Sequence, residues 1–178
     1  LGNNANVVRL LVANRANVNA QNTNGARALS FFIINGNRNS AMDLLKAGAE
    51  VNYVDNNGSS PLFLAVQQRD AVMVIELLRR KARIPNSGAW SAGDLLVIAA
   101  TNDDTETTRA LLNSGIKVDS PDRHGQSALV SAVYWGRKSA ARLLLERGAA
   151  PKAAIGIARE SGNREILEML EAASKRSI

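Results

Sequence analysis

The chain contains no cysteine, so no disulfide can hold its fold, and the redox compartment stays open. Histidine occurs once, at His124, which excludes the clusters of His and Cys that usually hold zinc. No apolar run approaches the roughly 18 residues that a membrane-spanning helix needs. The remaining composition, 46% hydrophobic and 21% charged over 178 residues, is typical of a globular protein long enough to bury a core.

The motifs of common enzymes are also missing. The stretch Gly125-Gln126-Ser127 lacks the closing glycine of a nucleophile elbow, and no glycine-rich phosphate loop occurs. Asp103, Asp104 and Glu106 lie together, but at the start of an expected helix, where acids interact favourably with the helix dipole. The sequence therefore predicts no enzymatic activity, no catalytic residue, no cofactor and no metal site.

Positive charge is unevenly distributed along the chain, whose formal net charge is +6. Residues 1–89 carry 10 Lys or Arg against 5 Asp or Glu, whereas residues 90–178 carry 12 against 11, which leaves +5 and +1. A basic half can bind nucleic acid or anionic lipid. Its densest basic run, residues 79–83, contains no aromatic side chain on which a base could stack. A solvated basic surface is the simpler interpretation, and binding of nucleic acid or lipid is kept as an alternative.

The feature that organises the sequence is an internal repeat. A segment that contains a leucine pair and ends near a glycine begins at Gly36, Arg69, Asp103 and Gly136, with separations of 33, 34 and 33 residues. A period of 20 to 50 residues is the signature of repeat architectures, in which each unit buries its apolar face against its neighbours. The leucine pairs are Leu44-Leu45, Leu77-Leu78, Leu111-Leu112 and Leu144-Leu145.

Each unit begins with a turn and a short helix. The turns contain Asn24-Gly25, Asn57-Gly58 and His124-Gly125, where glycine tolerates the positive φ of a tight turn. Ser60-Pro61 puts a hydroxyl at the N-cap of the first helix and proline at its first position, and Ser127 and Asp94 can cap the corresponding helices.

A longer second helix completes each unit. Its apolar residues have helical spacing, as in Val72, Ile75 and the pair Leu77-Leu78, and are expected to face the core. The helix ends at Gly48, Gly115 or Gly148, the C′ position that favours a left-handed conformation. Arg15 and Lys81 stand at this position in two units, where each residue either adopts a positive φ at a cost of about 1 kcal/mol or ends its helix differently.

These units resemble the ankyrin repeat family, whose signature T-P-L-H-x-A is matched best by Ser60-Pro61-Leu62-Phe63-Leu64-Ala65. Residues 122–129 and 24–29 are looser copies of the same turn and helix start. The resemblance covers nearly the whole chain. It implies an all-α solenoid of helix–turn–helix units with short β-hairpin or loop fingers, whose usual function is to bind another protein on a concave face.

The predicted organisation is a single ankyrin-repeat domain over residues 1–178. A partial repeat at 1–20 supplies only a second helix, so we expect at least half a repeat upstream of Leu1. The unit at 86–119 has one extra residue near 86–90, which predicts a remodelled finger. Two polar helices, at about 154–161 and 164–173, are expected to cap the stack. The predicted segments are 1–20, 21–53, 54–85, 86–119, 120–151 and 152–178.

The resemblance also implies where a partner would bind, because ankyrin fingers and the exposed ends of first helices usually make the contacts. Both tryptophans and one of the two tyrosines fall at such positions, although aromatic residues make up only 4% of the chain. Tyr and Trp are favoured interface anchors. The competing interpretation is that these rings pack between repeats. The predicted contact residues are Asn56, Asn57, Trp90, Arg123, His124 and Gln126 on the fingers, and Gln67, Gln68, Tyr134 and Trp135 on the first helices.

The sequence thus predicts a non-enzymatic module that is monomeric alone and binds a partner protein, with Phe31, Phe32 and Phe63 in the core. One alternative is a bacterial immunity protein that neutralises a toxin or effector enzyme. The other is binding of nucleic acid or anionic lipid through the basic half, a partner class that the sequence does not favour. Localisation stays open between the cytoplasm and, if a leader has been removed, the periplasm.

Overall fold

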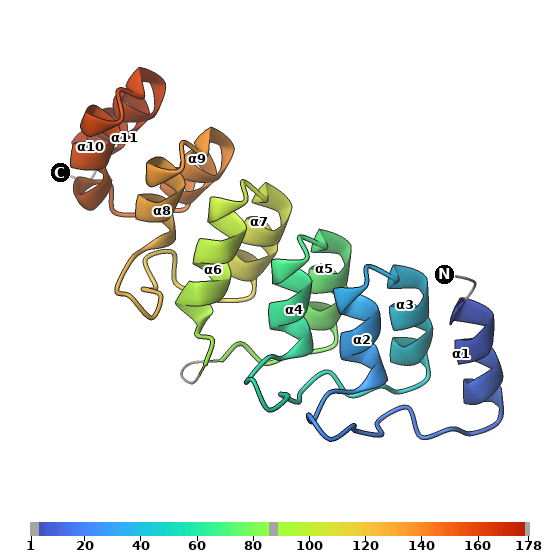
Figure 1. Ribbon diagram of the computed structural model, residues 1–178. Coiled ribbons are helices and arrows are strands. Elements are labelled where there is room, and N and C mark those ends of the chain that lie inside the picture. The colour runs from blue at the N-terminus through green and yellow to red at the C-terminus, as the bar shows by residue number, and fades with distance from the viewer. Residues whose placement is uncertain (1–3, 86–88, 177–178) are drawn as a thin grey trace. The chain divides into compact units, whose positions relative to one another are not determined.

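The computed structural model describes residues 4–85 and 89–176, which form 11 helices and, within those ranges, no β-strand (Figure 1). A single β-bridge joins Gln21 to Arg27. None of the described helices is both long and apolar enough to span a membrane. The chain divides into two compact units, Leu1–Arg83 and Ile84–Ile178, which we call unit 1 and unit 2.

In unit 1, helices of two rows alternate along the chain. The second helices α1, α3 and α5 form one row, and the first helices α2 and α4 form the other (Figure 1). Helix α1 packs on α3, α2 packs on α3 and α4, and α4 packs on α5. The bounds are α1 Asn4–Ala13, α2 Ala28–Ile34, α3 Arg38–Lys46, α4 Pro61–Gln67 and α5 Ala71–Arg79.

Unit 2 has the same pairing of a first and a second helix. Helices α6, α8 and α10 pack in succession, α7, α9 and α11 lie behind them, and α10 packs on α11 at the C-terminal end. The all-α, helix–turn–helix fold that the sequence predicts is therefore confirmed. The bounds are α6 Ala92–Thr101, α7 Thr105–Asn113, α8 Ala128–Tyr134, α9 Lys138–Glu146, α10 Lys152–Glu160 and α11 Arg164–Arg176.

Side-chain caps start most of the helices, but one predicted cap is wrong. Ser60 and Ser127 accept hydrogen bonds from the third backbone N–H of α4 and α8, as expected. Asp94 does not cap α6, because this helix begins earlier and has 10 residues where α4 and α8 have seven. Its N-cap is Ser91, and Asp94 is the acidic member of a capping box with Ser91.

Left-handed residues follow the second helices even where the repeat lacks its glycine. Arg15 and Lys81 have φ values of 59° and 61°, so of the two possibilities that the sequence leaves open, both residues adopt the positive φ. Arg69 and Asp103, at 57° and 55°, are left-handed as well, in the turns that connect first to second helices. The fold thus imposes this geometry even where a Cβ makes it unfavourable.

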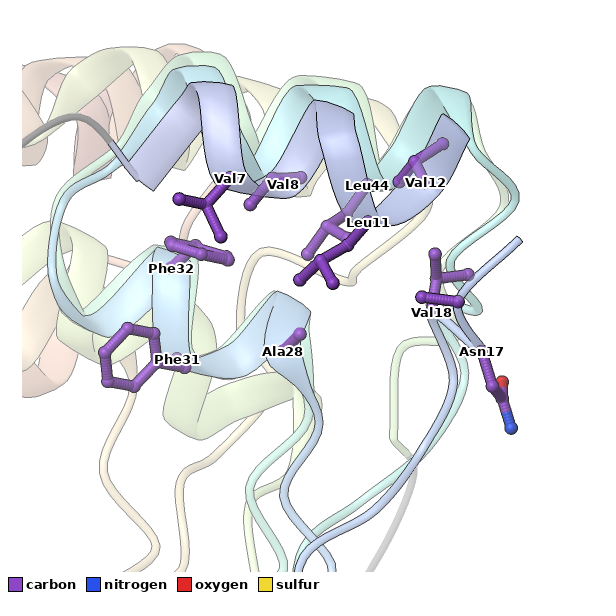
Figure 2. A pocket seen from close by; sticks show the side chains of 11 residues that line it. Val7, Val8, Leu11, Val12, Asn17, Val18, Ala28, Phe31, Phe32 and Leu44 are labelled. Atoms are coloured by element: carbon purple, nitrogen blue, oxygen red, sulfur yellow. The ribbon is translucent and has the colours of Figure 1, made fainter. Parts of the chain in front are cut away.

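Burial follows the predicted repeat, with three exceptions. The leucines 44, 77, 111 and 144 are buried, as are Phe32 and Phe63. Phe31, expected in the core, is exposed because it lines an open groove on a side of α2 that none of the described helices covers (Figure 2). Val72 and Ile75, also expected inward, are exposed because Met73, Val74 and Leu77 form the buried face of α5 instead.

A buried tyrosine takes over the cap of α2. Arg27 stands at the N-cap, and its side chain makes no capping hydrogen bond. The Tyr53 hydroxyl instead accepts a hydrogen bond from the Ser30 backbone N–H (3.2 Å) and lies 2.6 Å from Ser30 Oγ. Ser30 is the third residue of α2, so Tyr53 does for α2 what Ser60 and Ser127 do for α4 and α8. Burial raises the pKa of Tyr53, which keeps the hydroxyl protonated.

Hydrogen bonds from three equivalent side chains tie neighbouring repeats together within each unit. Asn19, Asn52 and Asp119 each follow a valine near the end of a repeat. Each accepts a hydrogen bond from a backbone N–H of the next repeat. The bonds are Asn19 Oδ1 to Glu50 N (2.9 Å), Asn52 Oδ1 to Arg83 N (2.7 Å) and Asp119 Oδ1 to Ala150 N (3.1 Å).

Candidate functional site

The fingers are rigid turns built around one acceptor each. In the finger before α8, Asp122 Oδ1 accepts hydrogen bonds from the backbone N–H groups of His124 and Gln126, both at 2.8 Å. Asn22 and Asp55 make the same pairs of bonds in unit 1. Each turn contains a left-handed glycine, such as Gly125 at φ 79°. The side chains at the fingertips are therefore presented from a fixed backbone.

The predicted contact residues of unit 1 are exposed on these elements. Asn57 is at a fingertip, and Gln67 and Gln68 end α4. Asn56 is exposed too, but its side-chain amide donates to Thr23 O (3.3 Å) and its backbone N–H to Asn24 O (3.0 Å). Asn56 therefore also holds two successive fingers together.

In unit 2, Arg123 and Trp90 are bound to each other. The Arg123 guanidinium lies over the Trp90 ring, 3.9 Å from its centroid, at a distance typical of a cation–π contact. Arg123 Nε donates to Asp94 Oδ1 at 2.8 Å, and Arg123 Nη2 donates to Ala89 O. The N-terminal turn of α6 and the following finger are thus joined by one side chain, in an assembly we call the Arg123 clamp (Trp90, Asp94 and Arg123).

A glycine makes the Arg123 clamp possible. Gly93 is buried in the first turn of α6, and a Cβ built on it would lie 1.9 Å from Pro121 O. The finger backbone can come this close to the helix only at a residue without a side chain. The sequence did not indicate Asp94 as a partner of Arg123, nor the close approach of Gly93 to Pro121. A glycine inside a helix was the one available signal, because glycine disfavours a helix interior.

Asp94 is the electrostatic centre of the Arg123 clamp. Burial acts to raise the pKa of Asp94, but hydrogen bonds from Arg123 and Ser91 outweigh it and hold this pKa below its ordinary value. The carboxylate is therefore charged at neutral pH, and both of its oxygens accept hydrogen bonds from Arg123 or Ser91. This arrangement is structural, and it holds the finger that carries His124 and Gln126.

Two aromatic side chains at the end of α8 are exposed together. Tyr134 is 64% exposed and Trp135 is 56% exposed, and their rings meet edge to face with centroids 5.2 Å apart. Equivalent positions at the ends of α4 and α6 carry the polar pairs Gln67-Gln68 and Thr101-Asn102, and the end of α2 carries Ile34-Asn35, with Ile34 48% exposed. An aromatic pair left in solvent, where α4 and α6 have polar residues, is a candidate binding anchor.

The structure brings the predicted residues together in two groups within unit 2. Tyr134 contacts Trp135, and Arg123 contacts Trp90, while His124 and Gln126 are exposed on the same finger as Arg123. Asn56, Asn57, Gln67 and Gln68 belong to unit 1.

Other chemistries find little support in the described part of the chain. Residues 4–85 and 89–176 contain no group of three or more His, Cys, Asp or Glu side chains that could hold a metal ion. The basic run at 79–83 is partly neutralised, since Glu76 pairs with Arg79 Nε (2.8 Å) and Arg80 Nε (2.6 Å). Hydrogen bonds from the two arginines lower the pKa of Glu76 to about 2, which keeps it charged.

Comparison with known proteins decides the family. A family model described as ankyrin repeats (3 copies) matches residues 1–88 and 73–155. The chain is an ankyrin-repeat protein. Its fold is that of a crystallised ankyrin repeat domain from Acinetobacter baumannii AYE, with a TM-score of 0.83 and 26% identity over 96% of this chain and 92% of that one.

Curated relatives of this ankyrin-repeat protein are much longer than it is. Potassium channel AKT2/3 of Arabidopsis thaliana is 32% identical over 148 residues, which are 83% of this chain and 18% of the channel. Neurogenic locus notch homolog protein 2 of Homo sapiens is 34% identical over 147 residues, 82% of this chain and 6% of that protein. Ankyrin repeats are in general protein–protein interaction modules and are typically non-enzymatic.

Proposed function

We propose that this ankyrin-repeat protein is a non-enzymatic module that binds a partner protein, with Tyr134 and Trp135 as the anchor of the contact. The exposed aromatic pair carries the proposal. Together the two rings offer a large apolar area at little rotamer cost, and burying such rings dominates the binding energy of many interfaces. The equivalent pairs at the ends of α4 and α6 are polar, and the end of α2 carries one apolar side chain, Ile34, so an aromatic pair at this position supports the repeat of α8 as the contact point.

The neighbouring finger supplies the polar contacts in this proposal. His124 and Gln126 are exposed side chains on a backbone fixed by Asp122. The Arg123 clamp holds this finger to α6, which reduces the entropy that the finger would lose on binding. In unit 1 taken by itself, Asn57, Gln67 and Gln68 are the proposed contact residues on the equivalent elements, with Asn56 positioning the finger.

The test compares two exposed apolar pairs of similar exposure. Proteins captured from the native host by the wild-type chain would be identified by mass spectrometry, and their affinities measured for purified variants. The double variant Tyr134→Ala, Trp135→Ala should bind the true partner with an affinity at least about 100-fold lower, since hot-spot truncations cost about 2 kcal/mol or more each. Val72→Ala with Ile75→Ala, which removes exposed apolar area from α5, is the matched control and should change affinity little.

The outcomes separate the proposal from its alternatives. Equal losses from both pairs, or no loss from either, would exclude Tyr134 and Trp135 as the anchor. If the captured protein is a toxin or effector enzyme, and the wild-type chain blocks its activity, the result would support the immunity alternative. Retention on DNA or on phospholipid vesicles that falls steeply with salt would instead favour binding of nucleic acid or anionic lipid by the basic half of the chain.

A further inference from the structure

Three Asn-Gly pairs occur in the chain, and all of them belong to unit 1. In such a pair the glycine nitrogen can attack the asparagine side chain, because glycine carries no side chain that hinders its approach. Each of these glycines is left-handed, with φ between 65° and 75°, and each donates its N–H to a carbonyl of its own turn. The pairs differ in how firmly the asparagine is held. They are Asn24-Gly25, Asn35-Gly36 and Asn57-Gly58.

Asn35 is held on both sides in the turn between α2 and α3. Its side-chain amide donates to Phe31 O at 2.7 Å, and its backbone N–H donates to the same oxygen at 3.1 Å. Just beyond it, the Asn37 N–H donates to Phe32 O at 2.9 Å, and the Asn37 side chain caps α3. To bring the Gly36 nitrogen onto the side chain, the Asn35 backbone must rotate. The reaction at Asn35 would therefore break the junction between two helices.

Asn24 is held through its carbonyl group. The Asn56 N–H of the next finger donates to Asn24 O at 3.0 Å, and the Asn56 side chain donates to Thr23 O at 3.3 Å. The two fingers are also in close contact, since a Cβ built on Gly25 would lie 2.9 Å from Asn56 Oδ1. Rotation of the Asn24 carbonyl would therefore detach one finger from the other.

Asn57 has neither restraint. Its side chain is exposed, and no hydrogen bond from the described residues reaches its amide or its carbonyl oxygen. The Asn57 N–H donates to Asp55 Oδ1 at 2.9 Å, and the Gly58 N–H donates to Asp55 O at 2.9 Å. The rotation that brings the Gly58 nitrogen onto the Asn57 side chain is thus opposed only by bonds within this one turn.

We propose that Asn57 is a modification site, at which the folded chain converts asparagine into aspartate and isoaspartate without an enzyme. The Gly58 nitrogen bonds to Asn57 Cγ, the Cγ–Nδ2 bond breaks, and ammonia leaves with the former Gly58 N–H proton. Water then opens the cyclic imide that results. Cleavage between the nitrogen and Cγ gives aspartate, and cleavage at the main-chain carbonyl gives isoaspartate. No atom changes its oxidation state.

The products change the fingertip in two ways. Both replace a neutral amide by a carboxylate two residues from Asp55, and isoaspartate also adds one methylene to the backbone between residues 57 and 58. The turn is then one atom longer between the two N–H groups, of residues 57 and 59, that Asp55 Oδ1 accepts at 2.9 and 2.8 Å. The chemistry needs no partner protein, so the inference is independent of the function proposed above.

The experiment follows all three pairs in the complete, folded chain. The protein is incubated at neutral pH in water labelled with heavy oxygen, and the peptides that contain each pair are analysed by mass spectrometry. We expect Asn57 to convert at least about tenfold faster than Asn24 or Asn35, because its reactive geometry needs the smallest local opening. In denaturant the three pairs should react at similar rates, which would assign the difference to the fold. Label in the product distinguishes this reaction from conversion before the incubation.

Two glutamine variants make the result specific. Asn57→Gln should remove the fast conversion, because a glutamine side chain would have to close a larger ring. Asn24→Gln, at the same position of the preceding finger, is the matched control and should leave the rate at Asn57 unchanged. A folded chain in which Asn57 reacts no faster than Asn24 and Asn35 would overturn the proposal. So would a product at residue 57 that contains aspartate alone, because the cyclic imide opens to isoaspartate as well.

Discussion

In each unit an arginine stacks on an aromatic ring and pairs with a carboxylate. The arginine is the buried member of the pair in unit 1, whereas the carboxylate is the buried member in unit 2. In unit 1, Arg27 lies 4.4 Å from the Tyr53 ring centroid and 2.7 Å from Glu50 Oε2, and the arginine is 12% exposed while the glutamate is 60% exposed. In unit 2, Arg123 is 40% exposed and its partner Asp94 is 7% exposed.

The difference shows which residue each unit depends on. A buried charge without a partner is strongly unfavourable, whereas an exposed charge is hydrated. Losing the Arg123 side chain leaves Asp94 buried with Ser91 and the backbone N–H of residue 123 (3.5 Å) as its donors, so unit 2 depends on its arginine. Losing Glu50 leaves Arg27 stacked on Tyr53, so unit 1 depends on the tyrosine, whose hydroxyl also caps α2. Four variants test this comparison.

The largest effect is expected for Gly93→Ala in unit 2. The new Cβ would lie 1.9 Å from Pro121 O, a backbone atom, so either α6 or the finger must shift. We expect the free energy of unfolding to fall by about 3 kcal/mol or more in chemical denaturation. Gly156→Ala is the matched control: its Cβ meets no atom within 4 Å, so stability should stay level or rise by about 0.5–1 kcal/mol. Similar losses in both variants would contradict the role of Gly93.

The next largest effect is expected for Arg123→Ala. The free energy of unfolding should fall by about 2 kcal/mol, because the substitution removes the main hydrogen-bond donor to a buried carboxylate. Arg164→Ala provides the comparison, since Arg164 forms an exposed pair with Glu168 and its loss should cost less than about 0.5 kcal/mol. Denaturation of the two variants at pH 7 measures both effects. If Arg123→Ala were as mild as Arg164→Ala, the Arg123 clamp would not be stabilising unit 2.

The third test lowers the pH and concerns Glu76 on helix α5 of unit 1. Its carboxylate pairs with both Arg79 and Arg80. The folded pKa is lowered from 4.5 to about 2, so its contribution is complete above about pH 4.5 and is lost as pH falls toward 2. Allowing for screening of the exposed Arg79, the contribution is about 1–2 kcal/mol. Glu76→Gln should therefore destabilise at pH 7 and flatten the decline between pH 4.5 and 2. An unchanged acid profile would show that the pairs add little.

The smallest effect is expected for Tyr53→Phe, which keeps the ring under Arg27 but removes the cap of α2. The free energy of unfolding should fall by about 1 kcal/mol, because the substitution removes the buried hydrogen bonds between the Tyr53 hydroxyl and Ser30. Adding Arg27→Ser restores the serine cap that α4 and α8 use, so the double variant should lose less than the two single losses combined. Strict additivity, measured by denaturation, would mean that Tyr53 does not act as the cap.

Local rules predicted the repeated parts of this fold and missed the pairings that each occur once. Ser60 and Ser127 were predictable as caps because capping depends on a few adjacent residues, and Arg15 and Lys81 as left-handed because their repeat equivalents are glycines. Arg123 on Trp90 was not predictable, because it requires α6 to begin one turn early, which moves Asp94 from the cap into the helix.

Exposure was the other property that the sequence left undetermined. Val72, Ile75 and Leu78 have helical spacing among themselves, and so do Met73 and Leu77 on another face, so periodicity alone could not choose the buried face of α5. Phe31 has a core-type side chain, and its exposure depends on a neighbouring helix rather than on its own sequence. Tyr134 and Trp135 were placed at exposed positions by their repeat register, and their side chains are exposed there.

The bonds from Asn19, Asn52 and Asp119 have a consequence for how such a protein can change its specificity. Each bond ends on a backbone N–H of the next repeat, so it persists whatever side chain that residue carries. These three bonds are therefore independent of the side chains available for recognition. Apart from Asn56 and Arg123, which also hold the fingers, residues at the fingertips and first-helix ends can change over evolution, or be randomised in a library, while these bonds between repeats are kept.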